Sequence, residues 1–117
     1  MKIFVYGTLM AGESNHSVLN CETTEYLGEA VTSRGFALYN LGGFPGMVCE
    51  GNDAVVGEVY KITPSTLRQL DILEGHPQFY RRLIIELQTG EQIQTYVLHS
   101  EYVRGCPLIK SGSWKHR

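Results

Sequence analysis

Glu74 is the residue of this chain whose position is hardest to explain by packing alone. The sequence predicts a helix that is capped by Thr63, has Pro64 in its first turn and ends at Gly75. At about 100° per residue, the Glu74 side chain falls about 20° from that of Leu67 and lies inside the apolar arc of this helix. A carboxylate that faces apolar side chains is more typical of a functional site than of a packed core.

Two effects should raise the pKa of the Glu74 carboxyl group. Apolar neighbours such as Leu67 and Leu70 exclude water from its charged form, and the last turn of a helix carries the negative end of the helix dipole. A raised pKa brings a carboxylate towards the strength of a general base near neutral pH. The alternative is that Glu74 extends into solvent, as most glutamates at helix ends do. Periodicity alone leaves both alternatives open.

A second group of residues follows the first predicted strand. Residues 2–6 are predicted to form a buried strand, which the glycine of Tyr6-Gly7-Thr8-Leu9 ends abruptly. Backbone N–H groups in such a turn can point together towards a carboxylate or a developing oxyanion. The alternative is an ordinary turn at a strand end.

A third group lies on the strand predicted after the helix. Strand alternation places Tyr80 and Arg82 on one face, opposite Phe79, Leu83 and Ile85. A phenol and a guanidinium that face the same way could orient a substrate or balance a carboxylate. They could equally belong to a solvated sheet face.

Other kinds of chemistry have little support in the sequence. Cys49 or Cys106 with His99 could form a nucleophile and its base, but no spacing supports that arrangement. The three cysteines are far apart and the histidines are isolated, so we expect neither a disulfide framework nor a metal site. No glycine motif for nucleotide phosphates occurs, and we expect no cofactor.

Length and composition restrict the class of protein. The 117 residues suit one domain, residues 1–117, and 43% apolar with 19% charged residues is typical of a folded globular chain. A net charge of −2 gives no basic field for nucleic acid. We interpret the basic run Lys110, Lys115, His116 and Arg117 as a solvated tail without a partner. We expect a cytoplasmic protein that does not enter a membrane, because signal-peptide and membrane-spanning patterns are missing.

Short strands separated by glycine-rich turns are predicted for the rest of the chain. Residues 11–20 are expected to form a loop or a short helix, and about the last fifteen residues an irregular segment. Six or seven strands with one helix predict an α+β fold, a small mixed β-barrel with one main helix packed beside it. The predicted strands are 2–6, 26–31, 36–40, 47–49, 55–62, 79–87 and 92–98, with turns at 42–46, 50–53 and 89–91.

Taken together, the motifs resemble those of the γ-glutamylcyclotransferase-like family, which includes AIG2-like proteins. The resemblance spans nearly the whole chain, and the Tyr-Gly-Thr-Leu start with the Leu-Asp-x-x-Glu-Gly segment is its most specific part. The matching residues are Tyr6-Gly7-Thr8-Leu9, Gly46, Gly57-Glu58-Val59-Tyr60, Leu70-Asp71, Glu74-Gly75, Tyr80, Arg82 and Ser111-Gly112-Ser113-Trp114.

The resemblance implies a pocket where residues 6–9 meet Glu74, with Glu74 as the general acid/base and Arg82 in a structural role. The substrate would be a small γ-glutamyl compound that is converted to 5-oxoproline and a free amine or amino acid. A non-catalytic small-molecule binding or regulatory domain on the same fold is the alternative. Specificity would come from residues 11–20 and 42–46, and the sequence chooses neither the substrate nor the oligomeric state. The residues that would bind the glutamyl part or line the pocket are Tyr6, Gly7, Thr8, Leu9 and Tyr80.

Overall fold

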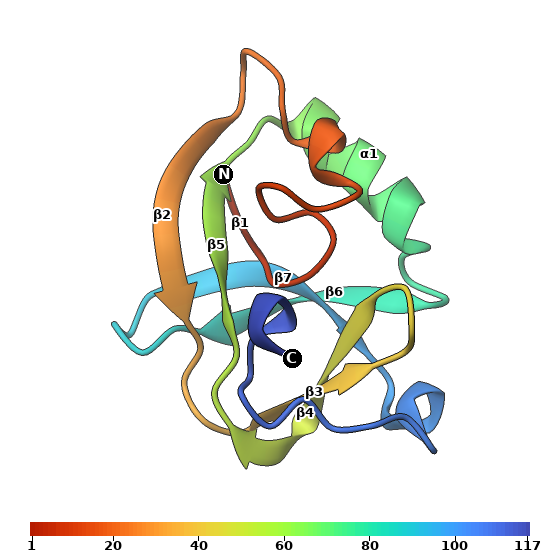
Figure 1. Cartoon of the computed structure of the whole chain (residues 1–117). Coiled ribbons are helices and arrows are strands. Elements are labelled where there is room, and N and C mark those ends of the chain that lie inside the picture. The colour runs from red at the N-terminus through yellow and green to blue at the C-terminus, as the bar shows by residue number, and fades with distance from the viewer.

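The structure is a computed structural model that describes residues 1–117, and its main element is a five-stranded mixed sheet in the order β2-β5-β1-β7-β6 (Figure 1). Strands β3 and β4 form a separate two-stranded sheet. Helix α1 and the short 3₁₀ helix η1 lie side by side (Figure 1). The strands are β1 Lys2–Val5, β2 Glu25–Val31, β3 Phe36–Asn40, β4 Pro45–Asp53, β5 Val56–Lys61, β6 Tyr80–Glu86 and β7 Gln92–Leu98, and the helices are α1 Pro64–Glu74, η1 His16–Val18, η2 Ser100–Val103 and η3 Trp114–His116.

The strands give the expected α+β class with one main helix, but they do not pair as one closed barrel. The outer strands β2 and β6 approach each other only at one end, where Thr32 and Leu87 form an isolated bridge. Strands β3 and β4 pair with each other instead of continuing the five-stranded sheet. The barrel expected from the sequence is therefore replaced by a sheet and a separate two-stranded ribbon.

Helix α1 begins and ends where the sequence predicts. The Oγ1 atom of Thr63 accepts a hydrogen bond from the Thr66 N–H at 3.2 Å, and Pro64 occupies the first turn. Gly75 ends the helix in the left-handed region, with φ 66° and ψ 37°. These local signals set the length of α1 and place Glu74 in its last turn.

Strand β4 is longer than the sequence predicts, because it continues through residues 50–53, where we expected a turn. Its register against β3 shifts between the pairs Phe36–Asp53 and Ala37–Val48. The residues between Val48 and Asp53 therefore form a large β-bulge within β4. This bulge explains why their composition resembles that of a turn.

The basic residues Lys110, Lys115, His116 and Arg117 are exposed, as expected, but the carboxyl-terminal segment that carries them packs against the rest of the molecule and is not a free tail. Trp114 is buried at 2% exposure. The Nζ atom of Lys115 donates a hydrogen bond to the carbonyl oxygen of Ala11 at 2.6 Å. Lys110 makes no such contact. No helix in the structure combines the length and the apolar character needed to cross a membrane.

Gly57 allows β5 to approach β1 closely. A Cβ atom at this position would lie 2.3 Å from the carbonyl oxygen of Val5 and 2.6 Å from a ring carbon of Phe4. Phe4 is fully buried, so neither neighbour has room to move.

We expect Gly57→Ala to lower the free energy of unfolding by about 1–3 kcal/mol, because the added methyl group overpacks the core. Urea denaturation measures this loss. Gly43→Ala is a matched control, since a Cβ atom at Gly43 would meet nothing within 4 Å. A similar loss in both variants would contradict the explanation by close approach.

Candidate functional site

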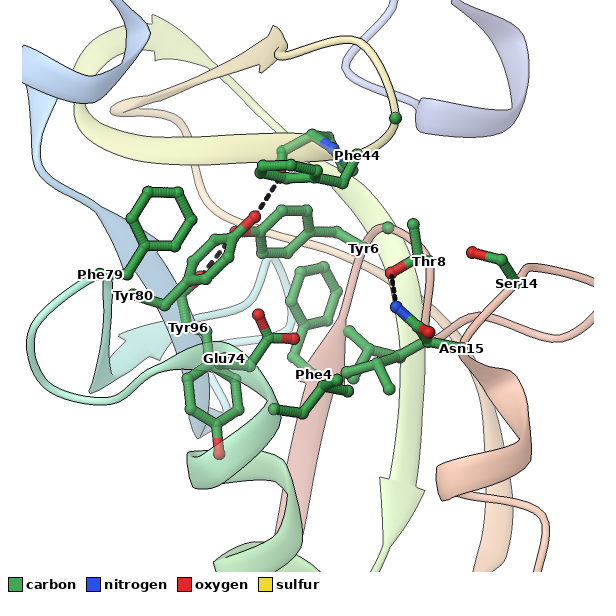
Figure 2. A pocket seen from close by; sticks show the side chains of 16 residues that line it. Phe4, Tyr6, Thr8, Ser14, Asn15, Phe44, Glu74, Phe79, Tyr80 and Tyr96 are labelled. Atoms are coloured by element: carbon green, nitrogen blue, oxygen red, sulfur yellow. Dashed lines mark hydrogen bonds between the residues drawn. The ribbon is translucent and has the colours of Figure 1, made fainter.

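One pocket brings together the residues that the sequence singles out (Figure 2). It has a volume of about 240 Å³ and lies between the turn after β1, the end of α1, the start of β6 and the turn between β3 and β4. Arg82 does not line it. The sequence-predicted residues that line this pocket are Tyr6, Gly7, Thr8, Leu9, Glu74 and Tyr80.

The other lining residues carry no motif that sequence reasoning could single out. Ser14 and Asn15 come from residues 11–20, and Gly43 to Pro45 come from residues 42–46, the two loops from which we expect specificity. The remainder are residues whose patterns are also typical of a core, namely Phe4, Val5, Leu73, Phe79 and Tyr96.

The Glu74 carboxylate lies in the middle of the lining side chains, among the rings of Phe4, Tyr80 and Tyr96 (Figure 2). Burial raises the pKa of Glu74 from 4.5 to about 7, with no hydrogen bond or ion pair to offset it. The helix dipole, which we also expected to contribute, is not needed to explain the shift. At neutral pH this carboxyl group can therefore both accept and donate a proton.

The turn after β1 holds backbone N–H groups that are free of protein acceptors. Those of Gly7, Thr8 and Leu9 donate no hydrogen bond within the protein. The carbonyl groups of the same turn are occupied: that of Gly7 accepts from the Met10 N–H at 3.1 Å, and that of Thr8 from the Asn15 N–H at 2.8 Å. The turn is thus held by its carbonyl groups, and its N–H groups remain available for an anion or a carbonyl oxygen.

The hydroxyl groups of Tyr6 and Tyr80 are bound to the backbone of neighbouring strands. Tyr6 Oη donates to the Tyr96 carbonyl oxygen at 2.7 Å and accepts from the Met47 N–H at 3.2 Å. Tyr80 Oη donates to the Pro45 carbonyl oxygen at 2.5 Å. Burial raises the pKa of both phenols well above the ordinary value, so both stay protonated. What these residues offer the pocket is mainly the surface of their rings.

Arg82 lies outside the pocket and joins α1 to the sheet. Its Nε and Nη2 atoms donate to the two carboxylate oxygens of Asp71 at 2.9 and 3.1 Å, and its Nη1 atom donates to Gln94 Oε1 at 2.6 Å. Tyr96 Oη donates to the same Asp71 carboxylate at 2.6 Å. Because Asp71 lies one turn before Glu74, this network sets where the last turn of α1 lies over the pocket.

We expect Asp71→Asn to lower the free energy of unfolding at pH 7 by about 1–3 kcal/mol, because Arg82 then loses its charged partner. Burial opposes ionisation of Asp71, but hydrogen bonds from Arg82 and Tyr96 outweigh it and hold the pKa of Asp71 below 3.8. This stabilisation is present above the pKa of the unfolded chain and is lost as the pH falls through the folded pKa. Urea denaturation should therefore show a smaller difference between the two proteins at pH 3 than at pH 7. An equal difference at both pH values would contradict this role of the Asp71 charge.

Known proteins share both the sequence pattern and the fold. A family model described as "Gamma-glutamyl cyclotransferase, AIG2-like" matches residues 3–116. The chain is 46% identical, over 98% of its length and 96% of the relative, to a Vibrio cholerae protein whose name carries gamma-glutamylcyclotransferase as an unproven assignment.

Solved structures extend this similarity to the tertiary fold. The solution NMR structure of protein ytfP from Escherichia coli matches with a TM-score of 0.75 and 37% identity, over 97% of this chain and 96% of that one. The crystal structure of an AIG2-like protein from Mus musculus matches with a TM-score of 0.77 and 28% identity, over 92% and 84% of the two chains.

Proposed function

Because this chain belongs to the gamma-glutamyl cyclotransferase, AIG2-like family, we propose that it is an enzyme that converts a γ-glutamyl amide or amine to 5-oxoproline and a free amine or amino acid. The observation that supports this reaction best is the Glu74 carboxyl group, with a pKa of about 7, in a pocket that the turn at residues 7–9 also lines. A site that only binds a ligand has little need for an unpaired carboxylate among aromatic rings. This favours the enzyme over a non-catalytic binding or regulatory domain.

In the proposed reaction, the substrate attacks itself. The α-amine of the γ-glutamyl group is protonated at neutral pH and must lose two protons to become the ring nitrogen of 5-oxoproline. One proton passes to solvent, which leaves the free amine. The amine nitrogen then bonds to the γ-carbonyl carbon and closes the five-membered ring, and the Glu74 carboxylate accepts the second proton from this nitrogen. The bond between that carbon and the leaving nitrogen breaks as Glu74 returns a proton to this nitrogen. One carboxyl group with a pKa near neutrality serves both transfers.

The turn after β1 would hold the oxygen atoms of the substrate. The free N–H groups of Gly7, Thr8 and Leu9 suit either the α-carboxylate or the negative charge that develops on the γ-carbonyl oxygen. Because both reacting groups belong to one molecule, a substrate folded into the attacking shape gains on the order of 7 kcal/mol from proximity. The proposed reaction therefore needs one acid/base and a well-shaped pocket.

The direct test is to incubate the protein with γ-glutamyl amino acids, γ-glutamyl peptides and γ-glutamyl amines and to measure 5-oxoproline by mass spectrometry. We expect at least one class to be converted, with release of one free amine per 5-oxoproline. If none is converted while γ-glutamyl compounds still bind, as measured by calorimetry, the proposed enzyme is wrong and the binding domain is right.

A further inference from the structure

Glu58 is the only Asp, Glu, Lys or Arg residue that is buried in this structure, at 7% exposure, and it does not line the pocket. It lies in β5, within the Gly57-Glu58-Val59-Tyr60 segment, to which the proposed reaction gives no role. Burying a charge is costly unless it is paired and hydrogen-bonded. The contacts of this carboxylate should therefore indicate what it does.

The Glu58 carboxylate and Lys115 hold Ala11 from two sides. Glu58 Oε1 accepts hydrogen bonds from the Ala11 N–H at 2.9 Å and from Tyr60 Oη at 2.8 Å. Lys115 Nζ donates to the Ala11 carbonyl oxygen at 2.6 Å and lies 3.7 Å from Glu58 Oε2. Both polar groups of one backbone residue are thus bound by two side chains of opposite charge, which also pair with each other.

The carboxyl-terminal segment that carries Lys115 makes a second contact with the loop that contains Ala11. Trp114 Nε1 donates to Glu13 Oε1 at 2.9 Å, and the indole ring is buried. Helix η3, which contains Trp114 and Lys115, lies in front of the sheet beside β5 (Figure 1). A buried ring therefore fixes the segment from which Lys115 reaches Ala11.

Ala11 is connected directly to the turn that lines the pocket. It lies two residues after Leu9, and the Met10 N–H between them donates to the Gly7 carbonyl oxygen at 3.1 Å. A shift of the chain at Ala11 would therefore pull on the turn at residues 7–9. The free N–H groups of that turn can bind a substrate oxygen strongly only if they are held in place beforehand.

We propose that Glu58 and Lys115 form a clamp on Ala11 that positions the N–H groups of residues 7–9 for the substrate. Neither side chain touches the substrate, so both are positioning residues. Their effect on catalysis rests on the proposed function, whereas their effect on the order of the loop does not. If the N–H groups hold the α-carboxylate of the substrate before and during the reaction, a loosened turn weakens ground-state and transition-state binding alike. It then raises KM more than it lowers kcat.

The test compares Lys115→Met with Lys110→Met. The first substitution removes the ammonium group of the clamp, and the second removes an exposed lysine of the same segment for which the structure shows no bond. We expect Lys115→Met to speed hydrogen exchange of the Ala11 N–H about tenfold, measured by NMR, and to raise KM for a converted γ-glutamyl substrate by about as much. Lys115→Arg keeps a hydrogen-bond donor and the positive charge, so its exchange rate at Ala11 and its KM should stay close to those of the unchanged protein. Lys110→Met should leave both values as in the unchanged protein.

The two readouts separate the clamp from the proposed reaction. If no γ-glutamyl compound is converted, the proposed function fails, but hydrogen exchange at Ala11 still tests the clamp. If substrate is converted and Lys115→Met matches Lys110→Met in exchange and in KM, the clamp is wrong and the reaction stands. A fall in kcat while hydrogen exchange at Ala11 stays unchanged would also contradict the clamp, because the effect of Lys115 would then not pass through Ala11.

Discussion

Glu74→Gln should lower kcat for a converted γ-glutamyl substrate by about 10²–10⁴-fold, which is the usual contribution of general acid–base catalysis. Glutamine keeps the size and polarity of the side chain but cannot exchange a proton with the substrate. The walls of the pocket and the turn at residues 7–9 are unchanged, so KM should change much less than kcat. Steady-state kinetics of 5-oxoproline formation measures both values.

The pH dependence provides a second readout of the same substitution. Because the proposed reaction uses the ionised form of Glu74 as the base, and the pKa of Glu74 is about 7, kcat/KM should rise with pH through this value. The residual activity of Glu74→Gln should lack this rise. Glu22→Gln, which changes an exposed glutamate, is the matched control and should keep both rate and pH profile. Full activity of Glu74→Gln would exclude Glu74 as the acid/base.

Glu74→Gln should also raise the free energy of unfolding at alkaline pH relative to the unchanged protein, by on the order of 3 kcal/mol at pH 8. Burial raises the pKa of Glu74 from 4.5 to about 7, so between these values the folded protein holds a proton that the unfolded chain has released. Stability from this group is complete below the unfolded pKa and is lost as the pH rises through the folded pKa. Glutamine has no proton to lose and does not destabilise the fold in this way.

Urea denaturation of both proteins between pH 5 and pH 8 measures this effect. The unchanged protein should lose stability across this range relative to Glu74→Gln, and the difference should be small near pH 5. Glu22→Gln should follow the unchanged protein at every pH. A difference between the unchanged protein and Glu74→Gln that does not depend on pH would mean that the carboxyl group is not buried as the structure has it. The contribution of Asp71 falls at lower pH, because its pKa is below 3.8, and does not interfere.

Parts of the site could be predicted from the sequence because local interactions determine them. The hydroxyl of Thr63, the ring of Pro64 and the left-handed conformation of Gly75 set the bounds of α1 through contacts a few residues apart. These bounds put Glu74 in the last turn of α1, and helical periodicity puts it on the apolar side. The break at Gly7 after an apolar strand is a local signal of the same kind.

Other features required the tertiary structure, because they depend on partners far apart in the sequence. The Thr32–Leu87 bridge, which is the only pairing of the outer strands, joins residues from opposite halves of the chain. Tyr96 lines the pocket, but the sequence pattern shows it only as an ordinary strand residue. The sequence places Lys115 in a basic tail, whereas in the structure its ammonium group donates a hydrogen bond to Ala11, which lies more than a hundred residues earlier.

The sequence by itself determined that a carboxylate would lie in the last turn of a helix, on its apolar side, and that a glycine turn would follow the first strand. Only the tertiary structure decided that Glu74 and this turn share a pocket, that aromatic rings surround the carboxylate, and that Glu58 faces Ala11. The physical reason is that caps and turns arise from short-range backbone bonding, whereas the pKa of Glu74 depends on water excluded by side chains from distant strands.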